Sequence, residues 1–273
     1  CFCPFPPPPR PLRARCPNCD KRERGPTSCP ECGSTEIIHK GIGTKLIESE
    51  LKKRFPSATI ARFDGDTATA DALDQRYQEL YDGSIDIIVG TQVIAKGLDL
   101  PHLRHVSVVQ ADAGLALPDF MASERTFQLL AQVIGRVGRS SHPTAVVVQS
   151  YQPDASAVRY GISQDYAAFY RETIEIRKKT FFPPFTYLLK LTCVYKTERT
   201  TISHAQNLAA VLRSRHPRVT IFGPTPAFYE RQRDTYRWQI VVKSTDRQTL
   251  LDIIVHDLPS AHWQYDIDPM TLL

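Results

Sequence analysis

Hydrophobic residues in the middle of the chain fall into short runs that alternate with helical patterns. Leu46, Ile47, Leu51 and Phe55 recur at helical spacing along residues 44–54 and directly after them, and Pro56 ends that pattern. Apolar or β-branched runs predict strands at 58–63, 85–89, 105–109 and 145–148, with helices at 71–81 and 123–134 among them. Short apolar strands separated by helices are typical of a parallel sheet that is buried on both faces. We therefore expect an α/β lobe with a parallel sheet over residues 37–152.

The pattern changes after a stretch of connecting helices at 153–183. From there the sequence predicts strands at 188–195, 219–222, 238–242 and 263–267, and helices at 202–213 and 248–256. The order strand–helix–strand–strand–helix–strand (βαββαβ) is that of a ferredoxin-like domain. We expect a separate C-terminal domain of this kind over residues 184–273, so the whole chain is of the α/β class.

The N-terminal part of the chain is rich in cysteine and proline. Six of the seven cysteines lie within the first 32 residues. Four of them form two CxxC pairs: Cys16, Cys19, Cys29 and Cys32. Each pair can present two thiolates to one ion, and four thiolates complete a tetrahedral Zn²⁺ site. We therefore predict a structural zinc-binding segment over residues 1–36.

The spacing of the two pairs leaves the ligand sets open. Nine residues separate Cys19 from Cys29, which is shorter than the usual zinc-ribbon spacing. The two pairs can share one zinc ion, or each can complete a site with a further CxxC pair. A redox dithiol or a set of free thiols would also account for these cysteines. Cys193 lies in a predicted strand, and we expect it to be an apolar core residue.

The charge and hydropathy of the chain narrow its possible partners and location. Lys and Arg number 34 against 29 Asp and Glu, a net charge of +5. This mild excess permits a nucleic-acid partner without requiring one. No apolar run approaches the roughly 18 residues of a membrane helix, and no signal-peptide pattern is evident. We expect a cytoplasmic protein with no membrane partner, and, because the chain does not begin with Met, part of a longer one.

A loop rich in small and polar residues follows the predicted strand at 85–89. It contains, in order, Gly90, Thr91, Gln92, Lys96, Gly97 and Asp99. The carboxyl ends of parallel strands are where α/β sheets place their ligand contacts. Thr91 and Gln92 can donate hydrogen bonds to phosphates, and Lys96 beside Gly97 allows an anion to approach closely. An ordinary turn from strand to loop accounts for the same residues equally well.

The predicted helix at 123–134 leads into two arginines, each of which follows a glycine: Gly135-Arg136-Val137-Gly138-Arg139. Their planar guanidinium groups can bind a phosphate bidentately, and the glycines leave room for the ligand. Gln132 lies about one helical turn before Arg136. A basic helix end that only complements the helix dipole is the alternative, but that role requires neither the glycines nor Gln132. We predict a phosphate site formed by Gln132, Arg136 and Arg139.

These segments resemble those of a known enzyme class. Residues 132–139 are similar to motif VI of superfamily 2 helicases, and residues 86–101 are similar to their motif V. A narrower resemblance, to the PriA family of replication-restart helicases, rests on further motifs in order: Cys29-Pro30-Glu31-Cys32-Gly33-Ser34, Gly41-Ile42-Gly43-Thr44, Arg62-Phe63-Asp64-Gly65-Asp66-Thr67, Pro118-Asp119-Phe120, Pro183-Pro184-Phe185 and Tyr236-Arg237-Trp238-Gln239. The resemblance covers about residues 12–270. Met121 stands where the family usually has Arg.

The resemblance implies a function for the chain and roles for its arginines. It implies the C-terminal part of an ATP-dependent 3′→5′ DNA helicase that recognises stalled replication forks and starts primosome assembly, with a RecA-like lobe at 37–152. Arg139 would be the arginine finger on the γ-phosphate of ATP, supported by Arg136 and Gln132. The sequence contains neither GxxxxGK[ST] nor a DEAH-type box, so ATP and Mg²⁺ would bind mainly to a lobe upstream.

The same resemblance assigns the loop after residue 89 and the two CxxC pairs. Thr91, Gln92, Lys96 and Gly97 would couple the nucleotide state to single-stranded DNA, and Asp99 would order their loop. The family has two zinc ions, and its last two CxxC pairs belong to different ions.

Partners are implied for the C-terminal domain as well. They are branched and single-stranded DNA, the acidic tail of single-stranded-DNA-binding protein, and other primosome proteins. Arginines and aromatic residues are interleaved in residues 213–243, which suits stacked DNA or an acidic, aromatic peptide. Arg237 is the candidate for the tail carboxylates, and a solvated basic face is the alternative. For this chain alone, which has no Walker lysine, a non-catalytic zinc-bearing DNA or protein adaptor is the alternative function.

Overall fold

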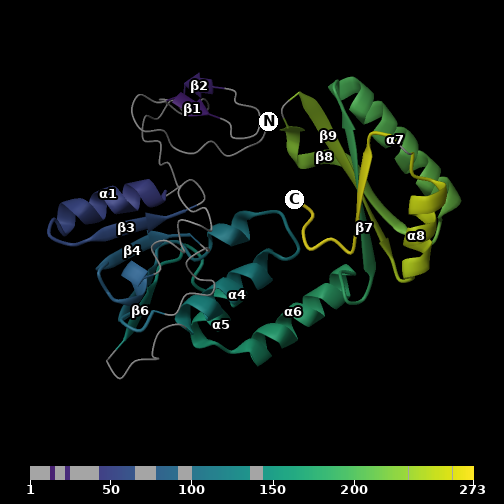
Figure 1. The fold of residues 1–273 in the computed structure, drawn as a ribbon. Coiled ribbons are helices and arrows are strands. Elements are labelled where there is room, and N and C mark those ends of the chain that lie inside the picture. The colour runs from purple at the N-terminus through teal and green to yellow at the C-terminus, as the bar shows by residue number, and fades with distance from the viewer. Residues whose placement is uncertain are drawn as a thin grey trace, which may run out of the picture. The chain divides into compact units, whose positions relative to one another are not determined.

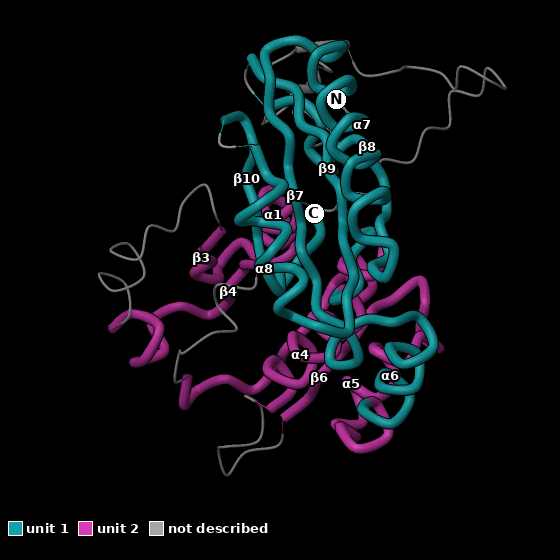
Figure 2. Tube along the Cα trace, turned by 90° about the vertical axis from the view of Figure 1, so that its right-hand side faces the viewer, with its two compact units in different colours: residues 1–35, 118–121, 170–273 teal, residues 36–117, 122–169 magenta. Residues whose placement is uncertain are grey.

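The computed structural model describes residues 13–15, 22–24, 43–64, 78–91, 100–135, 144–232, 234–259 and 261–273. The chain divides into two compact units (Figure 2). Unit 1 contains residues 1–35, 118–121 and 170–273, and unit 2 contains residues 36–117 and 122–169. The sequence predicts four functional segments that meet at residues 36, 152 and 183. These boundaries stay predictions.

Unit 2 contains two pairs of parallel strands: the parallel direction is as predicted, but the described strands form two separate pairs rather than the single sheet that was expected. Strand β3 (Ile60–Phe63) pairs with β4 (Ile87–Gly90), and β5 (His105–Val108) pairs with β6 (Ala145–Val148). Helix α1 (Thr44–Arg54) precedes β3, and its last turn carries three basic residues that complement the helix dipole. Ala61, Phe63, Leu80 and Ile85 form the core beside the β3–β4 pair.

A second core lies against the β5–β6 pair. Helix α4 (Ala122–Ile134) packs on α5 (Ser156–Ser163), and Leu130 and Val158 are fully buried between them and the strands. Gly161 makes this packing possible, because a Cβ there would lie 2.9 Å from the Cβ of Leu130. The short helix η1 (Ala113–Ala116) precedes α4.

The predicted burial on both faces is wrong for β5 and β6. In both strands, half-buried and exposed residues alternate. Val108 and Val148 face the core of Leu130 and Val158, whereas Val147 is 47% exposed. The helices described in this part of unit 2 pack on one side of the strand pair, and the valine-rich sequence of β6 does not distinguish one covered face from two.

The C-terminal part of unit 1 is one antiparallel sheet with two helices (Figure 1). The strands stand in the order β10-β7-β9-β8 and the chain runs β7 (Tyr187–Tyr195), α7 (Glu198–Arg215), β8 (Thr220–Gln232), β9 (Thr235–Ser244), α8 (Arg247–His256), β10 (Trp263–Ile267). The order of elements is the predicted βαββαβ. Leucine, isoleucine and valine side chains from β7 and β9 pack against α7 and α8 in a fully buried core.

Side-chain caps fix where the two helices begin. The hydroxyl of Thr197 accepts from the backbone N–H of Thr200 at the start of α7. The carboxylate of Asp246 accepts from the N–H groups of Gln248 and Thr249 at the start of α8. Such caps satisfy donors that have no partner in the first helical turn.

Most predicted elements are confirmed to within a few residues, and two need comment. The sequence predicts strand β8 at 219–222, but the strand continues to Gln232, so that prediction is wrong by ten residues. Of the helix predicted at 71–81, residues 78–81 are helical and the rest lie outside the described residues. The connecting segment predicted at 153–183 contains α5 and α6 (Tyr166–Thr180).

No helix in the described ranges has the length and apolar character that crossing a membrane requires. Cys193 is buried in β7, as predicted for a core residue, and burial raises the pKa of its thiol to about 12.

Candidate functional site

The carboxyl ends of β3 and β4 meet at one edge of their sheet. Phe63 and Gly90 are register partners, and the N–H of Thr91 donates to the carbonyl oxygen of Phe63 (3.3 Å). Thr91 is exposed, whereas Asp64, which follows β3, is buried. Open α/β sheets bind ligands at this edge, so the predicted site residue Thr91 lies where a ligand contact is expected.

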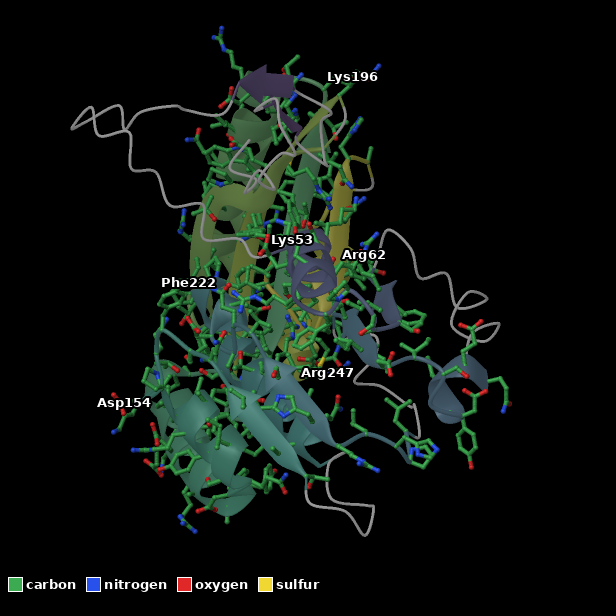
Figure 3. All side chains as sticks on the ribbon, turned by 90° about the vertical axis from the view of Figure 1, so that its left-hand side faces the viewer. Lys53, Arg62, Asp154, Lys196, Phe222 and Arg247 are labelled. Carbon is green, nitrogen blue, oxygen red and sulfur yellow. The ribbon has the colours of Figure 1, made fainter. Side chains whose placement is uncertain are left out.

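A network of charged side chains ties the start of α1 to this edge. The hydroxyl of Thr44 donates to Oδ2 of Asp64 (2.5 Å), and Nη1 of Arg62 donates to the same oxygen. Nε of Arg62 donates to Oε2 of Glu48 (3.0 Å), so one guanidinium joins two carboxylates (Figure 3 labels Arg62). The network holds the beginning of the segment after β3 in place.

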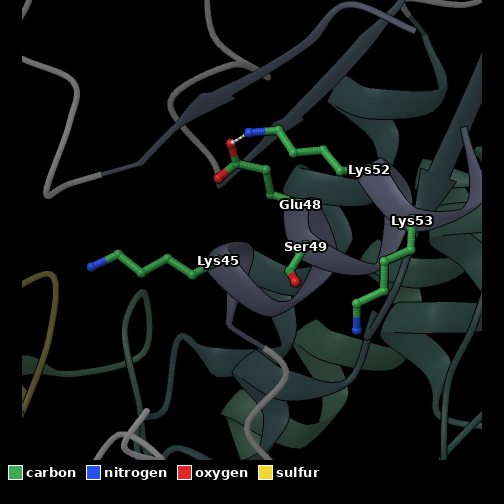
Figure 4. A pocket seen from close by; sticks show the side chains of 5 residues that line it. All are labelled: Lys45, Glu48, Ser49, Lys52 and Lys53. Carbon is green, nitrogen blue, oxygen red and sulfur yellow. Dashed lines mark hydrogen bonds and ion pairs between the residues drawn. The ribbon is translucent and has the colours of Figure 1, made fainter. Parts of the chain in front are cut away.

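Glu48 also binds Lys52 on the outer side of α1. Nζ of Lys52 donates to its Oε1 (2.7 Å), as Figure 4 shows. This hydrogen bond is the main cause that lowers the pKa of Glu48, and the charges of Lys52 and Arg62 add to it against an opposing effect of burial. A shallow hollow on this side is lined only by α1 residues: Lys45, Glu48, Ser49, Lys52 and Lys53 (Figure 4). Because Lys52 and Lys53 are already paired with Glu48 and Glu50, we interpret the hollow as the solvated side of the helix.

A buried carboxylate marks the corresponding edge of the β5–β6 pair. Asp112 is 5% exposed and accepts hydrogen bonds from the hydroxyl of Ser150 and the N–H of Tyr151, both at 3.0 Å. Sequence reasoning predicts neither Asp64 nor Asp112 as a site residue. Each directly follows a parallel strand or its short extension, and that position is the signal that could have found them.

The predicted phosphate site is described only in part. Gln132 is exposed in the last turn of α4, and the N–H of Gly135 continues that turn by donating to the carbonyl of Ala131 (2.9 Å). A Cβ at Gly135 would lie 2.9 Å from this carbonyl oxygen, so glycine suits the helix end as well as any ligand. Arg136 and Arg139 lie outside the described residues. Within the described ranges, no hydrogen bond joins Gln132 to Thr91.

The remaining residues predicted for the loop after β4 and for zinc also fall outside these ranges: Gln92, Lys96, Gly97, Asp99, Cys16, Cys19, Cys29 and Cys32. Two short strands, β1 (Arg13–Arg15) and β2 (Arg22–Arg24), pair antiparallel on either side of the connection that contains Cys16 and Cys19. The part of the chain that is described holds no group of three or more His, Cys, Asp or Glu suited to a metal ion.

Arg237 lies on β9, half-buried. Its Nη1 donates to Oε1 of Gln232 (2.6 Å), and its Nη2 donates to Oε1 of Gln264 on β10 (3.0 Å). Its Nε is buried and has no hydrogen-bond partner in the described structure. Burial lowers the pKa of Lys190, and the positive charge of Arg237 lowers it further. The two cations therefore share one polar region of the sheet.

The hairpin formed by β8 and β9 carries the aromatic residues and some of the basic residues predicted between 213 and 243, whereas Arg213 and Arg215 lie on α7. The guanidinium of Arg231 lies over the ring of Tyr236, 5.4 Å from its centre, and Phe228 packs edge-on against Tyr229. Tyr229 is 42% exposed. Trp238 is only half-buried, and its buried Nε1 has no partner in the described residues.

Comparison with known proteins gives two domain matches. Residues 33–141 match the helicase conserved C-terminal domain, and residues 178–270 match the primosomal protein N C-terminal domain. The first match includes the edge formed by β3 and β4, and the second includes the antiparallel sheet with α7 and α8.

Several curated proteins are similar along most of the chain. The replication restart protein PriA of Bacillus subtilis (strain 168) is 37% identical over 233 residues, which is 85% of this chain and 29% of that protein. Those of Synechocystis sp. (34% over 264 residues; 94% and 32%) and Treponema pallidum (32% over 266 residues; 95% and 40%) are similar too. The chain thus spans about a third of the length of these relatives.

Proposed function

Because the chain belongs to the PriA family of replication restart proteins and corresponds to their C-terminal portion, we propose that it completes the ATP site of a DNA helicase. The longer protein is then an ATP-dependent 3′→5′ DNA helicase that acts in the cytoplasm, recognises stalled replication forks and starts primosome assembly. The observation that carries this proposal is the match of residues 33–141 to a helicase C-terminal domain. That match makes the non-catalytic adaptor the less favoured function.

In this proposal the end of α4 faces the nucleotide. Gln132 is exposed there, and the helix closes on Gly135, directly before Arg136. Gln132 and Arg136 would hold phosphate oxygens, and Arg139 would stabilise the charge that develops on the γ-phosphate. ATP, when bound, supplies the phosphoryl group that is transferred to water. Most contacts to ATP and Mg²⁺ would come from outside this chain, since its sequence has no GxxxxGK[ST].

The loop after β4 would couple the nucleotide state to single-stranded DNA. Thr91 begins this loop at the sheet edge, and the network of Thr44, Arg62 and Asp64 holds the neighbouring strand end rigid. We propose that Thr91, Gln92, Lys96 and Gly97 transmit the nucleotide state to single-stranded DNA, and that Asp99 orders the loop. Of these five residues, Thr91 is the one that the structure describes.

The test of the arginine finger uses a full-length PriA protein that contains this chain. Arg139→Lys should lower DNA-stimulated ATP hydrolysis about as much as Arg139→Ala, roughly a thousandfold or more, because an ammonium cannot reproduce the planar fork. ATP binding should persist in both variants. The exchange Arg199→Lys, at an exposed position of α7, is the matched control. Near-normal turnover by Arg139→Lys would contradict the role.

A zinc-binding segment is proposed for residues 1–36. The donor set supports it, because four thiolates are a common structural zinc site. The pairing of β1 with β2 supports it too, since a CxxC pair then lies in the six-residue connection of a hairpin.

For the C-terminal domain we propose a ferredoxin-like fold and two kinds of partner. The βαββαβ order and the strand order β10-β7-β9-β8, with antiparallel pairing throughout, support the fold. Branched or single-stranded DNA and the acidic tail of single-stranded-DNA-binding protein are the proposed partners, besides other primosome proteins. Arg237 and the neighbouring Lys190 would receive the tail carboxylates.

Titration of this chain with a labelled acidic tail peptide tests the partner proposal. Arg237→Ala should weaken binding, and added salt should weaken it in the wild type, because screened charges carry the encounter. Arg218→Ala, at an exposed position before β8, is the control. Equal affinity of wild type and Arg237→Ala would remove Arg237 from the site.

A further inference from the structure

The sheet of unit 1 has a polar face on the side away from α7 and α8. Leu189 and Leu191 of β7 pack into the core against these helices, so Lys190 between them points to the opposite face. On β9, Ile240 packs into the same core, and alternation along the strand places Arg237 on the face of Lys190. The positive charge of Arg237 acts on Lys190 there. All residues of this face belong to unit 1.

The two cations of this face have neutral hydrogen-bond partners. Arg237 donates to two glutamine side chains, its buried Nε has no partner in the described residues, and Lys190 donates to a main-chain oxygen. Among the described residues neither cation forms an ion pair, although the charges of Asp266 and Asp119 act on Lys190 from farther away. An ionised acceptor makes a stronger hydrogen bond to a cation than a neutral one does. The polar face therefore favours an anionic partner.

Residues 268–273, here called the return segment, follow β10 and turn back over this face. Their start is fixed at β7, where the N–H of Asp268 donates to the carbonyl of Leu188 (2.8 Å) and Oδ1 of Asp268 accepts from the N–H of Leu188 (3.3 Å). Oδ2 of Asp268 accepts from Nε of Arg247 (3.0 Å), which Figure 3 labels. In Figure 1 the return segment, in yellow, lies to the left of β7, whereas α7 and α8 lie to its right.

The end of the return segment is held by a hydroxyl and a lysine. The hydroxyl of Thr271 donates to Oδ2 of Asp119 (2.5 Å) and accepts from the N–H of Leu273 (3.2 Å). Nζ of Lys190 donates to the main-chain oxygen of Leu273 (2.5 Å). Leu272 and Leu273 are half-buried. A peptide with apolar side chains thus lies on the polar face and supplies an acceptor to Lys190.

We propose that the return segment and the acidic tail peptide bind the same surface of the sheet and exclude each other, so that the chain limits access to its own tail site. The tail would place carboxylates where Leu273 supplies one main-chain oxygen, and the unpaired Nε of Arg237 would gain an acceptor. The inference rests on the tail-binding role proposed above. A ligand that must displace a covering segment binds with an apparent affinity reduced by the fraction of molecules that are open. Weakening the return segment should therefore tighten binding.

The first experiment is a titration of this chain with the labelled acidic tail peptide. Thr271→Val removes the hydroxyl that binds Asp119 and Leu273 and keeps the shape of the side chain. It should bind the peptide about five- to tenfold more tightly than the wild type, because the loss of these hydrogen bonds raises the open fraction. Adding Lys190→Gln should abolish the gain, because the uncovered surface then lacks its ammonium group. Ser203→Ala, at an exposed position of α7 on the other side of the sheet, is the control.

The second experiment follows hydrogen exchange in the wild-type chain with and without saturating peptide. Amides of residues 270–273 should exchange faster when the peptide is bound, whereas those of α7 should not change. Faster exchange together with tighter binding by Thr271→Val supports the exclusion. Unchanged or slower exchange, or equal affinity of wild type and Thr271→Val, overturns it and leaves the tail partner in place. If neither chain binds the peptide, the proposed tail partner fails and the exclusion fails with it.

Discussion

Asp257 shows how single residues in this chain join elements that are distant in sequence. It follows α8, and its carboxylate accepts from Nη1 of Arg215 (2.6 Å) and lies 2.7 Å from Nε2 of His216, at the end of α7. Burial opposes ionisation of Asp257, but the hydrogen bonds from His216 and Arg215 lower its pKa overall. The carboxylate of Asp257 thereby joins the ends of α7 and α8, a contact called the clasp below.

This clasp predicts a pH-dependent contribution to stability. A carboxyl whose pKa is lower in the folded than in the unfolded chain stabilises fully above its unfolded pKa, about 3.9, and loses this effect as the pH falls through the folded value. Asp257→Asn should therefore reduce the free energy of unfolding by about 1 kcal/mol at pH 7 and by much less near pH 3. Both tryptophans, Trp238 and Trp263, lie in unit 1. Urea unfolding followed by tryptophan fluorescence at each pH therefore measures this difference in the free energy of unfolding.

The control for Asp257 is Asp252→Asn on the same helix. Asp252 accepts from the side chain of Gln248 on its own helix (3.0 Å), so its exchange should change the free energy of unfolding by no more than about 0.5 kcal/mol at pH 7. A wild-type advantage over Asp257→Asn that persists unchanged at pH 3 would show that the clasp does not depend on ionisation.

Residue roles could be predicted where they follow from neighbours in sequence. Cys193 sits in an apolar strand pattern, and its burial is confirmed. Asp64 and Asp112 were not predicted, because their partners Thr44 and Ser150 are 20 and 38 positions away. Their position after a parallel strand is a local signal, but no local pattern reports these hydrogen-bond pairings. Arg237 was predicted as a binding residue, and that role stays a prediction.

Strand β8 shows what limits prediction at the level of elements. Its sequence contains Gly223, Pro224 and Pro226, which normally end a strand, and the prediction stopped at Phe222. β8 is an edge strand, however, and its pairing with β9 shifts register between Phe222 and Thr225 and again before Arg231. An edge strand with irregular pairing tolerates proline, because some of its N–H groups need no partner. Elements with clear periodicity and clear stops, such as α1 and β6, were predicted to the residue.

Gly223 is the residue that permits the first of these register shifts. Its φ is +90°, and a Cβ there would lie 2.8 Å from the carbonyl oxygen of Gln239. Gly223→Ala should therefore cost about 1–3 kcal/mol, through both a strained backbone and a clash with main-chain atoms. Tryptophan fluorescence during thermal unfolding measures the loss, because both tryptophans lie in the same unit.

Thr220→Ala is the matched substitution in the same strand. Thr220 is exposed, so its loss should change stability by no more than about 0.5 kcal/mol. Gly223→Ala that is no less stable than Thr220→Ala would mean that the hairpin relaxes around the added methyl group.

For the whole molecule, the sequence predicted the fold better than the site. The α/β character, the parallel strand pairs and the βαββαβ order follow from hydrophobic periods that each element carries by itself. The site depends on groups that no single element carries. In the proposed function, motif VI would supply arginines to a nucleotide that lies mainly on another lobe. Likewise, Asp119 accepts a hydrogen bond from Thr271, which is far from it in sequence.

Metal content is the prediction that concerns the chain as a whole. If Cys16, Cys19, Cys29 and Cys32 share one ion, freshly purified chain should contain about one zinc per molecule. Cys16→Ser should lose it, and Cys193→Ala should not. Elemental analysis before and after a chelator measures the content. Undetectable zinc in the wild type would contradict a shared site and favour ligand pairs that belong to different ions.

The two units are interleaved along the sequence, and this restricts how the protein can be divided. Unit 1 takes residues 118–121 from the middle of unit 2, and α6 begins in unit 2 and continues in unit 1 from residue 170. A fragment that starts near residue 178 would lack Phe120 and Arg177 and would expose the ring of Phe182. A fragment that ends near residue 141 would keep Phe120 without its partner. Recombination between relatives could therefore exchange the two units cleanly only if residues 118–121 were exchanged along with the C-terminal sheet.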